Sequence, residues 1–109
     1  MMSPHHLVNE PVRFTPAYLA QLLIHCQKIS ASDITLQTGE PIFAEVYGRL
    51  LTITRRKLSN TEVSEILNLI YGPNGSAQIL SGVDIDTHYE FRPNRNERYR
   101  FRVNATGCL

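Results

Sequence analysis

Residues 97–106 read ERYRFRVNAT, a stretch in which apolar side chains alternate with charged or polar ones. Successive side chains of a β-strand point to opposite faces of a sheet. The stretch is therefore predicted to be a strand with a core face and an arginine face. The core face would carry Tyr99, Phe101, Val103 and Ala105, and the other face Arg98, Arg100, Arg102 and Asn104. Because guanidinium groups stay charged and donate in a planar fork, this row should meet carboxylates of the protein or an anionic ligand.

The preceding stretch, residues 84–91, has the same alternation and is predicted to pair with residues 98–106 in a hairpin over a turn at 93–96. Ile85, Thr87, Tyr89 and Phe91 would share one face, and Asp86, His88 and Glu90 the other. The simplest cross-strand pairing sets the second group opposite the three arginines. In one interpretation the arginine face is then a solvated surface of weak ion pairs. In the other, the guanidinium row contacts phosphate.

The rest of the chain predicts a helix, a three-stranded meander and a second helix. Thr15 and Pro16 begin the first helix, which should end near Lys28 and bury a stripe of apolar residues at i, i+3, i+4 and i+7. Residues 34–36, 42–47 and 50–54 are expected to be antiparallel strands, with the reversal at Gly48. Ser59 and Glu62 form a capping-box pattern that starts the second helix, and residues 76–80 predict a further helical turn.

Length and composition indicate one ordinary globular domain of 109 residues, preceded by an extended arm at residues 1–14. The net charge of +1 argues against a general polyanion binder, so no direct nucleic-acid binding is expected. Two cysteines are too few for a disulfide framework and lack metal-ligand spacing, and His5-His6 is interpreted as part of a solvated tail. No metal site is predicted. Without a signal segment or a long apolar run, the expected location is the cytoplasm.

No catalytic site is predicted within the 109 residues. The stretch GPNGS at 72–76 lacks the lysine of a phosphate-binding loop and follows a helix, so it is interpreted as a helix stop. Asp84 and Asp86 lie near the arginines, which favours salt bridging over acid–base chemistry. The chain ends in what reads as mid-strand, so we expect it to be part of a longer protein.

Four stretches in order give the chain a family resemblance. They are ASDITL at 31–36, GEP at 39–41, VYGRL at 46–50 and RFRVNA at 100–105. Together they resemble the N-terminal domain of the secretion-ATPase superfamily, which includes the pilus-retraction ATPases and the type II and type IV secretion ATPases. Residues 40–51, 68–73 and 84–94 look closest to the Dot/Icm-type secretion ATPase and its plasmid conjugal-transfer counterpart. Thr35 departs from the histidine that many relatives have at this point.

The resemblance implies a PAS-like α+β domain at residues 15–109, with a curved antiparallel sheet and helices packed on one face. It also implies a RecA-like motor domain elsewhere in the parent protein, a homo-hexamer, and work with a secretion or conjugation apparatus at the inner membrane. In such hexamers, arginines of the strand that matches residues 100–105 reach the phosphates of ATP, which the motor domain holds together with Mg. Here these are Arg100, the first choice, and Arg102.

A different class of function is also compatible with the sequence. The alternative is a stand-alone PAS-like adaptor that binds a small ligand or a protein and has no ATPase role. Either way the 109 residues alone are not expected to hydrolyse ATP or to bind a nucleotide tightly.

Overall fold

A computed structural model describes residue 6, residues 14–72, residues 74, 77, 78 and 82, and residues 84–106. The expected arm at 1–14 therefore lies outside the described residues, apart from His6 and Phe14. Of the helical turn expected at 76–80, Ala77 and Gln78 are described and are helical.

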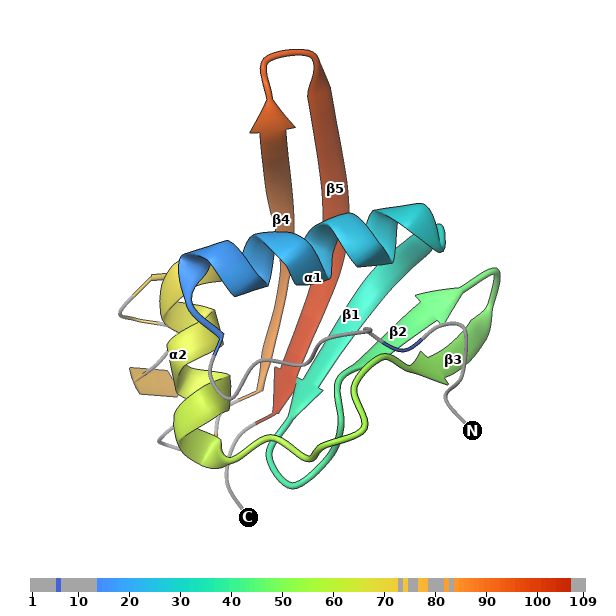
Figure 1. Cartoon of the computed structure of the whole chain (residues 1–109). Helices are drawn as coiled ribbons and strands as arrows, with labels where there is room; N and C mark the ends of the chain where they lie inside the picture. The colour runs from blue at the N-terminus through green and yellow to red at the C-terminus, as the bar shows by residue number, and fades with distance from the viewer. Residues whose placement is uncertain are drawn as a thin grey trace.

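The described chain folds into one mixed sheet and two helices (Figure 1). In chain order the elements are α1 (Pro16–Lys28), β1 (Ala31–Gln37), β2 (Phe43–Val46), β3 (Arg49–Thr52), α2 (Asn60–Ile70), β4 (Ile85–Asn94) and β5 (Glu97–Thr106). The five strands lie in the order β3-β2-β1-β5-β4. The sheet is open rather than closed into a barrel, and the α+β class predicted from the sequence is confirmed.

One strand pair departs from the antiparallel sheet that was expected. β1 and β2, β2 and β3, and β4 and β5 pair antiparallel, whereas β1 and β5 at the centre pair parallel. Antiparallel neighbours can be joined by short turns, but parallel strands need a long crossover connection. Here the chain between β1 and β5 includes β2, β3, α2 and β4, and this long segment provides that crossover.

The core lies between the helices and one face of the sheet, as predicted. α1 crosses that face in Figure 1, and apolar residues of both helices pack with inward residues of β1, β2 and β5. The largest fully buried side chains are Phe101, Leu22, Leu23, Ile34, Leu36, Ile42, Ile53, Leu58, Ile66, Leu67 and Val63. Phe101, Val103 and Ala105 are buried while Arg98, Arg100 and Arg102 are exposed, which confirms the predicted alternation of β5.

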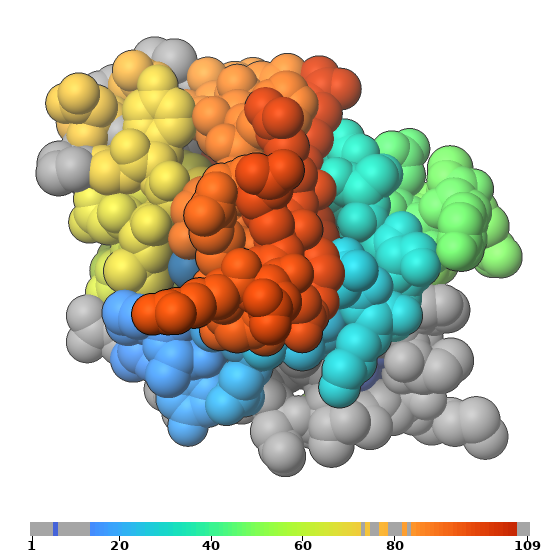
Figure 2. All heavy atoms as spheres, turned by 90° about the horizontal axis from the view of Figure 1, so that it is seen from above, coloured from blue at the N-terminus to red at the C-terminus, as the bar shows by residue number. Residues whose placement is uncertain are grey.

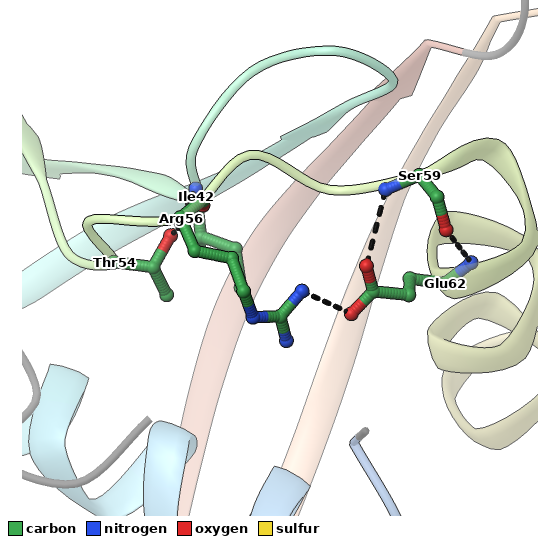
Figure 3. A network of polar contacts seen from close by, with 5 residues as sticks. All are labelled: Ile42, Thr54, Arg56, Ser59 and Glu62. Carbon is green, nitrogen blue, oxygen red and sulfur yellow. Dashed lines mark hydrogen bonds and ion pairs between the residues drawn. The ribbon is translucent and has the colours of Figure 1, made fainter. Parts of the chain in front are cut away.

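The capping box predicted for the second helix is present. The Oγ of Ser59 accepts a hydrogen bond from the backbone N–H of Glu62 at 3.2 Å, and the backbone N–H of Ser59 donates to Oε1 of Glu62 at 3.2 Å (Figure 3). The other carboxylate oxygen of Glu62 accepts from Arg56. One glutamate therefore satisfies the helix start and anchors the preceding loop.

The same loop is tied to the start of β2. The hydroxyl of Thr54, which is buried, accepts from the backbone N–H of Ile42 at 2.9 Å and donates to the carbonyl of Arg56 at 3.1 Å (Figure 3). These contacts fix the path of the segment that connects β3 to α2.

The predicted reversal at Gly48 is confirmed. Tyr47 and Gly48 both have positive φ, 50° and 79°, between β2 and β3. Two consecutive residues of this kind are typical of the type I′ turn, whose twist matches that of the flanking strands.

Candidate functional site

The β4–β5 hairpin carries the arginine face and projects from the body of the fold. In Figure 1 its turn extends beyond α1, and Figure 2 looks down on it from above. The strands pair from Ile85 opposite Ala105 to Asn94 opposite Glu97, with an irregularity between Phe91 and Asn94. The hairpin predicted from the alternating pattern is therefore confirmed.

The register differs by two residues from the simplest pairing. Glu90 lies opposite Arg100, His88 lies opposite Arg102, and Asp86 lies opposite Asn104. The turn closes between Asn94 and Glu97, with the irregularity on the β4 side, and this geometry sets the offset. Acidic and basic side chains still share one face, as predicted, but the ion pairs run diagonally.

Arg102 is held by a carboxylate of its own chain. Its Nε donates to Oδ1 of Asp86 at 3.0 Å and its Nη2 donates to Oδ2 at 2.7 Å, a bidentate geometry. This hydrogen bond lowers the pKa of Asp86 below its ordinary value and raises the pKa of Arg102. Both side chains are about half exposed, at 51% for Arg102 and 53% for Asp86, so water screens the pair.

Glu90 binds two other arginines of the hairpin. Its Oε2 accepts from Nε of Arg92 at 3.2 Å, and its Oε1 lies 3.3 Å from Nε of Arg98. Glu90 thus neutralises part of the positive charge at the outer end of the hairpin.

Arg100 differs from its neighbours in the row. It is exposed, and its guanidinium makes no hydrogen bond or ion pair with any residue that the structure describes. Glu90 is opposite it but is bonded to Arg92 and Arg98. Of the three arginines in the row, Arg100 is therefore the one whose guanidinium is not already engaged by a carboxylate of the described chain.

Two carboxylates beside the arginine row were not found from the sequence. β1 lies next to β5 and places Asp33 beside Arg102, and β2 places Glu45 beside Asp33. Both charges help to raise the pKa of Arg102. They come from strands about 60 residues away in sequence, so only the sheet order could reveal them.

An open hollow of about 430 Å³ lies at the hairpin turn, and Arg92, Arg95, Asn96, Glu97 and Arg98 line it. Arg100 and Arg102 lie outside this lining. The hollow is wide and polar, and Glu97 contributes a carboxylate to it, so its shape and charge select no particular ligand.

Other chemistry-bearing residues do not assemble into a site in the described part of the chain. No three His, Cys, Asp or Glu residues of that part gather as metal ligands. Cys26 lies on the buried face of α1, and burial raises the pKa of its thiol to about 12, so it is an inert core residue rather than a nucleophile. Within the described residues, no helix is both long enough and apolar enough to span a bilayer.

Two solved structures are similar to this chain. The X-ray structure of the Legionella pneumophila ATPase DotB matches 94% of the chain with 67% identity and a TM-score of 0.78. That of the Yersinia pseudotuberculosis ATPase DotB matches 88% with 28% identity and a TM-score of 0.71. The chain spans only 28% and 27% of the length of these two proteins. No protein-family model matches the sequence, and no curated protein matches it significantly.

Identity of this level over nearly the whole chain, together with a shared fold, shows common descent rather than fold similarity alone. The family expectation drawn from the four sequence motifs is thereby confirmed. The chain is a relative of the DotB ATPases, and it fits the N-terminal domain of a Dot/Icm-type secretion ATPase.

Proposed function

We propose that this chain is the regulatory and oligomerisation domain of a hexameric ATPase that powers type IV secretion or conjugal DNA transfer. In this proposal the PAS-like domain works at the cytoplasmic side of the inner membrane, as part of the secretion or conjugation apparatus. It presents Arg100, with Arg102 beside it, to ATP and Mg bound on a motor domain. Similarity to two DotB ATPases supports the class of protein, and the state of Arg100 supports the role of the arginines.

The observation that carries the proposal is the guanidinium of Arg100, which is exposed and has no polar partner among the described residues. A phosphate oxygen could accept from it without first breaking one of the ion pairs seen on the hairpin. An arginine delivered by a domain that moves can stabilise the charge that develops during phosphoryl transfer. ATP with Mg, when bound, supplies the phosphoanhydride that is cleaved, and this domain supplies positive charge only.

Arg102 is the secondary partner because Asp86 already engages it. That salt bridge is half exposed, and exposed ion pairs contribute little to stability. Arg102 could therefore leave Asp86 and bind a phosphate at a small cost in free energy. The position of the Arg102 side chain would then depend on whether a nucleotide is bound.

The proposal is tested with Arg100→Ala in a full-length ATPase that contains this domain. We expect kcat for ATP hydrolysis to fall roughly 10²-fold, because one donor to the transition-state charge is lost. Arg100→Lys should restore little of the loss, since lysine lacks the planar fork.

Arg95→Ala is the matched control, because it removes an exposed arginine of the hairpin turn rather than of the strand face. It should leave kcat near the wild-type value. Wild-type ATPase activity in Arg100→Ala would refute the proposed role of Arg100. An equal loss of activity in Arg100→Ala and Arg95→Ala would show that the loss comes from the removed positive charge in general and not from the position of Arg100.

A further inference from the structure

The side chains on the exposed face of β4 are complementary in charge to the same side chains taken in the opposite chain direction, as in an antiparallel strand pair. β4 ends the sheet in the order β3-β2-β1-β5-β4, so its outer side has no strand partner among the described residues. Every second residue of such an edge presents an unpaired backbone N–H and C=O, which is a template for another strand. On its exposed face β4 carries Asp86, His88, Glu90 and Arg92 in sequence.

We propose that β4 pairs with β4 of a second copy of this chain, antiparallel and centred on Tyr89. In this register Asp86 faces Arg92 of the other copy, and His88 faces Glu90 of the other copy. Two-fold symmetry repeats both contacts, so each carboxylate of the exposed face meets a guanidinium or an imidazole of the other copy. This interface is independent of the nucleotide role proposed above.

The two adjacent registers bring charges of one sign together on the exposed face. Centring the pair on His88 places Asp86 opposite Glu90, two carboxylates. Centring it on Glu90 places that carboxylate opposite itself and His88 opposite Arg92. Like charges directly opposite each other destabilise a strand pair.

Moving the centre of the pair by two residues in either direction is also worse. Centring the pair on Thr87 places Asp84 opposite Glu90. Centring it on Phe91 brings Pro93 into the ladder opposite Tyr89, where proline has no N–H to donate. Of the five registers centred from 87 to 91, the one centred on Tyr89 is therefore favoured.

The charged side chains of β4 are exposed enough to contact a second copy of the chain. Asp86 and Arg92 are 53% and 63% exposed, and Glu90 is 42% exposed. Asp86 already accepts from Arg102 and Glu90 from Arg92, but a carboxylate has about four acceptor positions and can bind a second donor. The intrachain pairs therefore need not break when the second copy binds.

The other face and the end of the strand fit the same arrangement. Thr87, Tyr89 and Phe91 are only partly buried within one chain, and pairing sets Tyr89 against Tyr89 and Thr87 against Phe91 of the second copy. Aromatic and β-branched residues of this kind stabilise cross-strand pairs. Pro93, which cannot donate to a ladder, lies just beyond the paired segment 86–92.

The test uses the 109-residue chain with two opposite charge changes, Asp86→Lys and Arg92→Glu. Wild type should show reversible, concentration-dependent dimers by sedimentation equilibrium. Each variant alone sets two like-charged pairs across the axis and should self-associate about tenfold more weakly. In a mixture of the two variants, the lysine introduced at position 86 faces the glutamate introduced at position 92. The unchanged Arg92 of one chain then faces the unchanged Asp86 of the other, so the mixture should form heterodimers about as well as wild type dimerises.

Arg95→Glu is the control, because it makes the same charge change outside the paired segment and should leave dimerisation unchanged. Recovery in the mixture also shows that both variants are folded. Three results would each overturn the proposal: a wild-type chain that stays monomeric, dimers that the two variants do not weaken, or a mixture that does not recover.

Discussion

At the scale of single residues, the arginine row divides into members with and without a partner. Arg102 is tied to Asp86 and Arg98 to Glu90, while the guanidinium of Arg100 makes no polar contact with the described residues. The alternation of β5 predicted that all three would share a face, and this is correct. It did not predict which guanidinium would be left without a carboxylate, because diagonal pairing depends on the hairpin register.

Asp86 gives a test of this pairing through its pKa. The hydrogen bond from Arg102 is the main reason that the pKa of Asp86 lies below its ordinary value of 3.8. A carboxyl group with a lowered pKa in the folded state adds stability above its unfolded pKa, and this stability is lost as pH falls through the folded pKa. We expect Arg102→Gln to raise the pKa of Asp86 toward 3.8, measured by a carboxyl NMR titration.

The matching control is Arg98→Gln, which removes a partner of Glu90 rather than of Asp86. It should leave the Asp86 titration in place. If Asp86 titrates at the same pH in the wild type and in Arg102→Gln, the pair seen in the structure is not formed in solution.

At the scale of elements, local signals were enough to locate both helices and all five strands of the described chain. Pro16 begins α1 and Ser59 caps α2, as predicted. Thr15 occupies the N-cap of α1 without a side-chain cap bond, so its hydroxyl does not play the expected part there. The strand expected at 34–36 begins earlier, at Ala31, because an irregularity between Ala31 and Asp33 interrupts its alternation.

The cap of α2 should contribute measurably to stability. Ser59→Ala removes the oxygen that accepts from the backbone N–H of Glu62. We expect the free energy of unfolding to fall by about 1 kcal/mol, measured by urea denaturation. Thr61→Ala, at an exposed position in the first turn, should change it much less. Equal effects of the two substitutions would show that the cap is not formed.

At the scale of the whole molecule, one aromatic side chain of β5 anchors the layer between sheet and helices. Phe101 is 1% exposed and is among the largest fully buried side chains. On the opposite face of the same strand are the arginines. Packing of Phe101 therefore fixes the position of Arg100 and Arg102 relative to the rest of the domain.

Phe101→Ala should destabilise the whole fold. We expect a loss of about 3–5 kcal/mol, since the transfer free energy of a buried aromatic ring and the cost of a cavity add together. Tyr99→Ala on the same face is the comparison, because Tyr99 is only partly buried near the projecting end of the hairpin. Urea denaturation of both variants should show the larger loss for Phe101→Ala, and the reverse order would contradict the packing described here.

The sequence by itself determined the elements, the capping box, the Gly48 reversal and the two-faced character of β5, because each depends on residues close together in the chain. It also indicated the resemblance to secretion ATPases, since its four motifs lie in order along one chain. Tertiary structure alone decided the parallel pairing of β1 with β5, the approach of Asp33 and Glu45 to Arg102, and the lack of a polar partner for Arg100 among the described residues. These features depend on which distant strands become neighbours and in what register, and an alternating pattern is the same in every such arrangement.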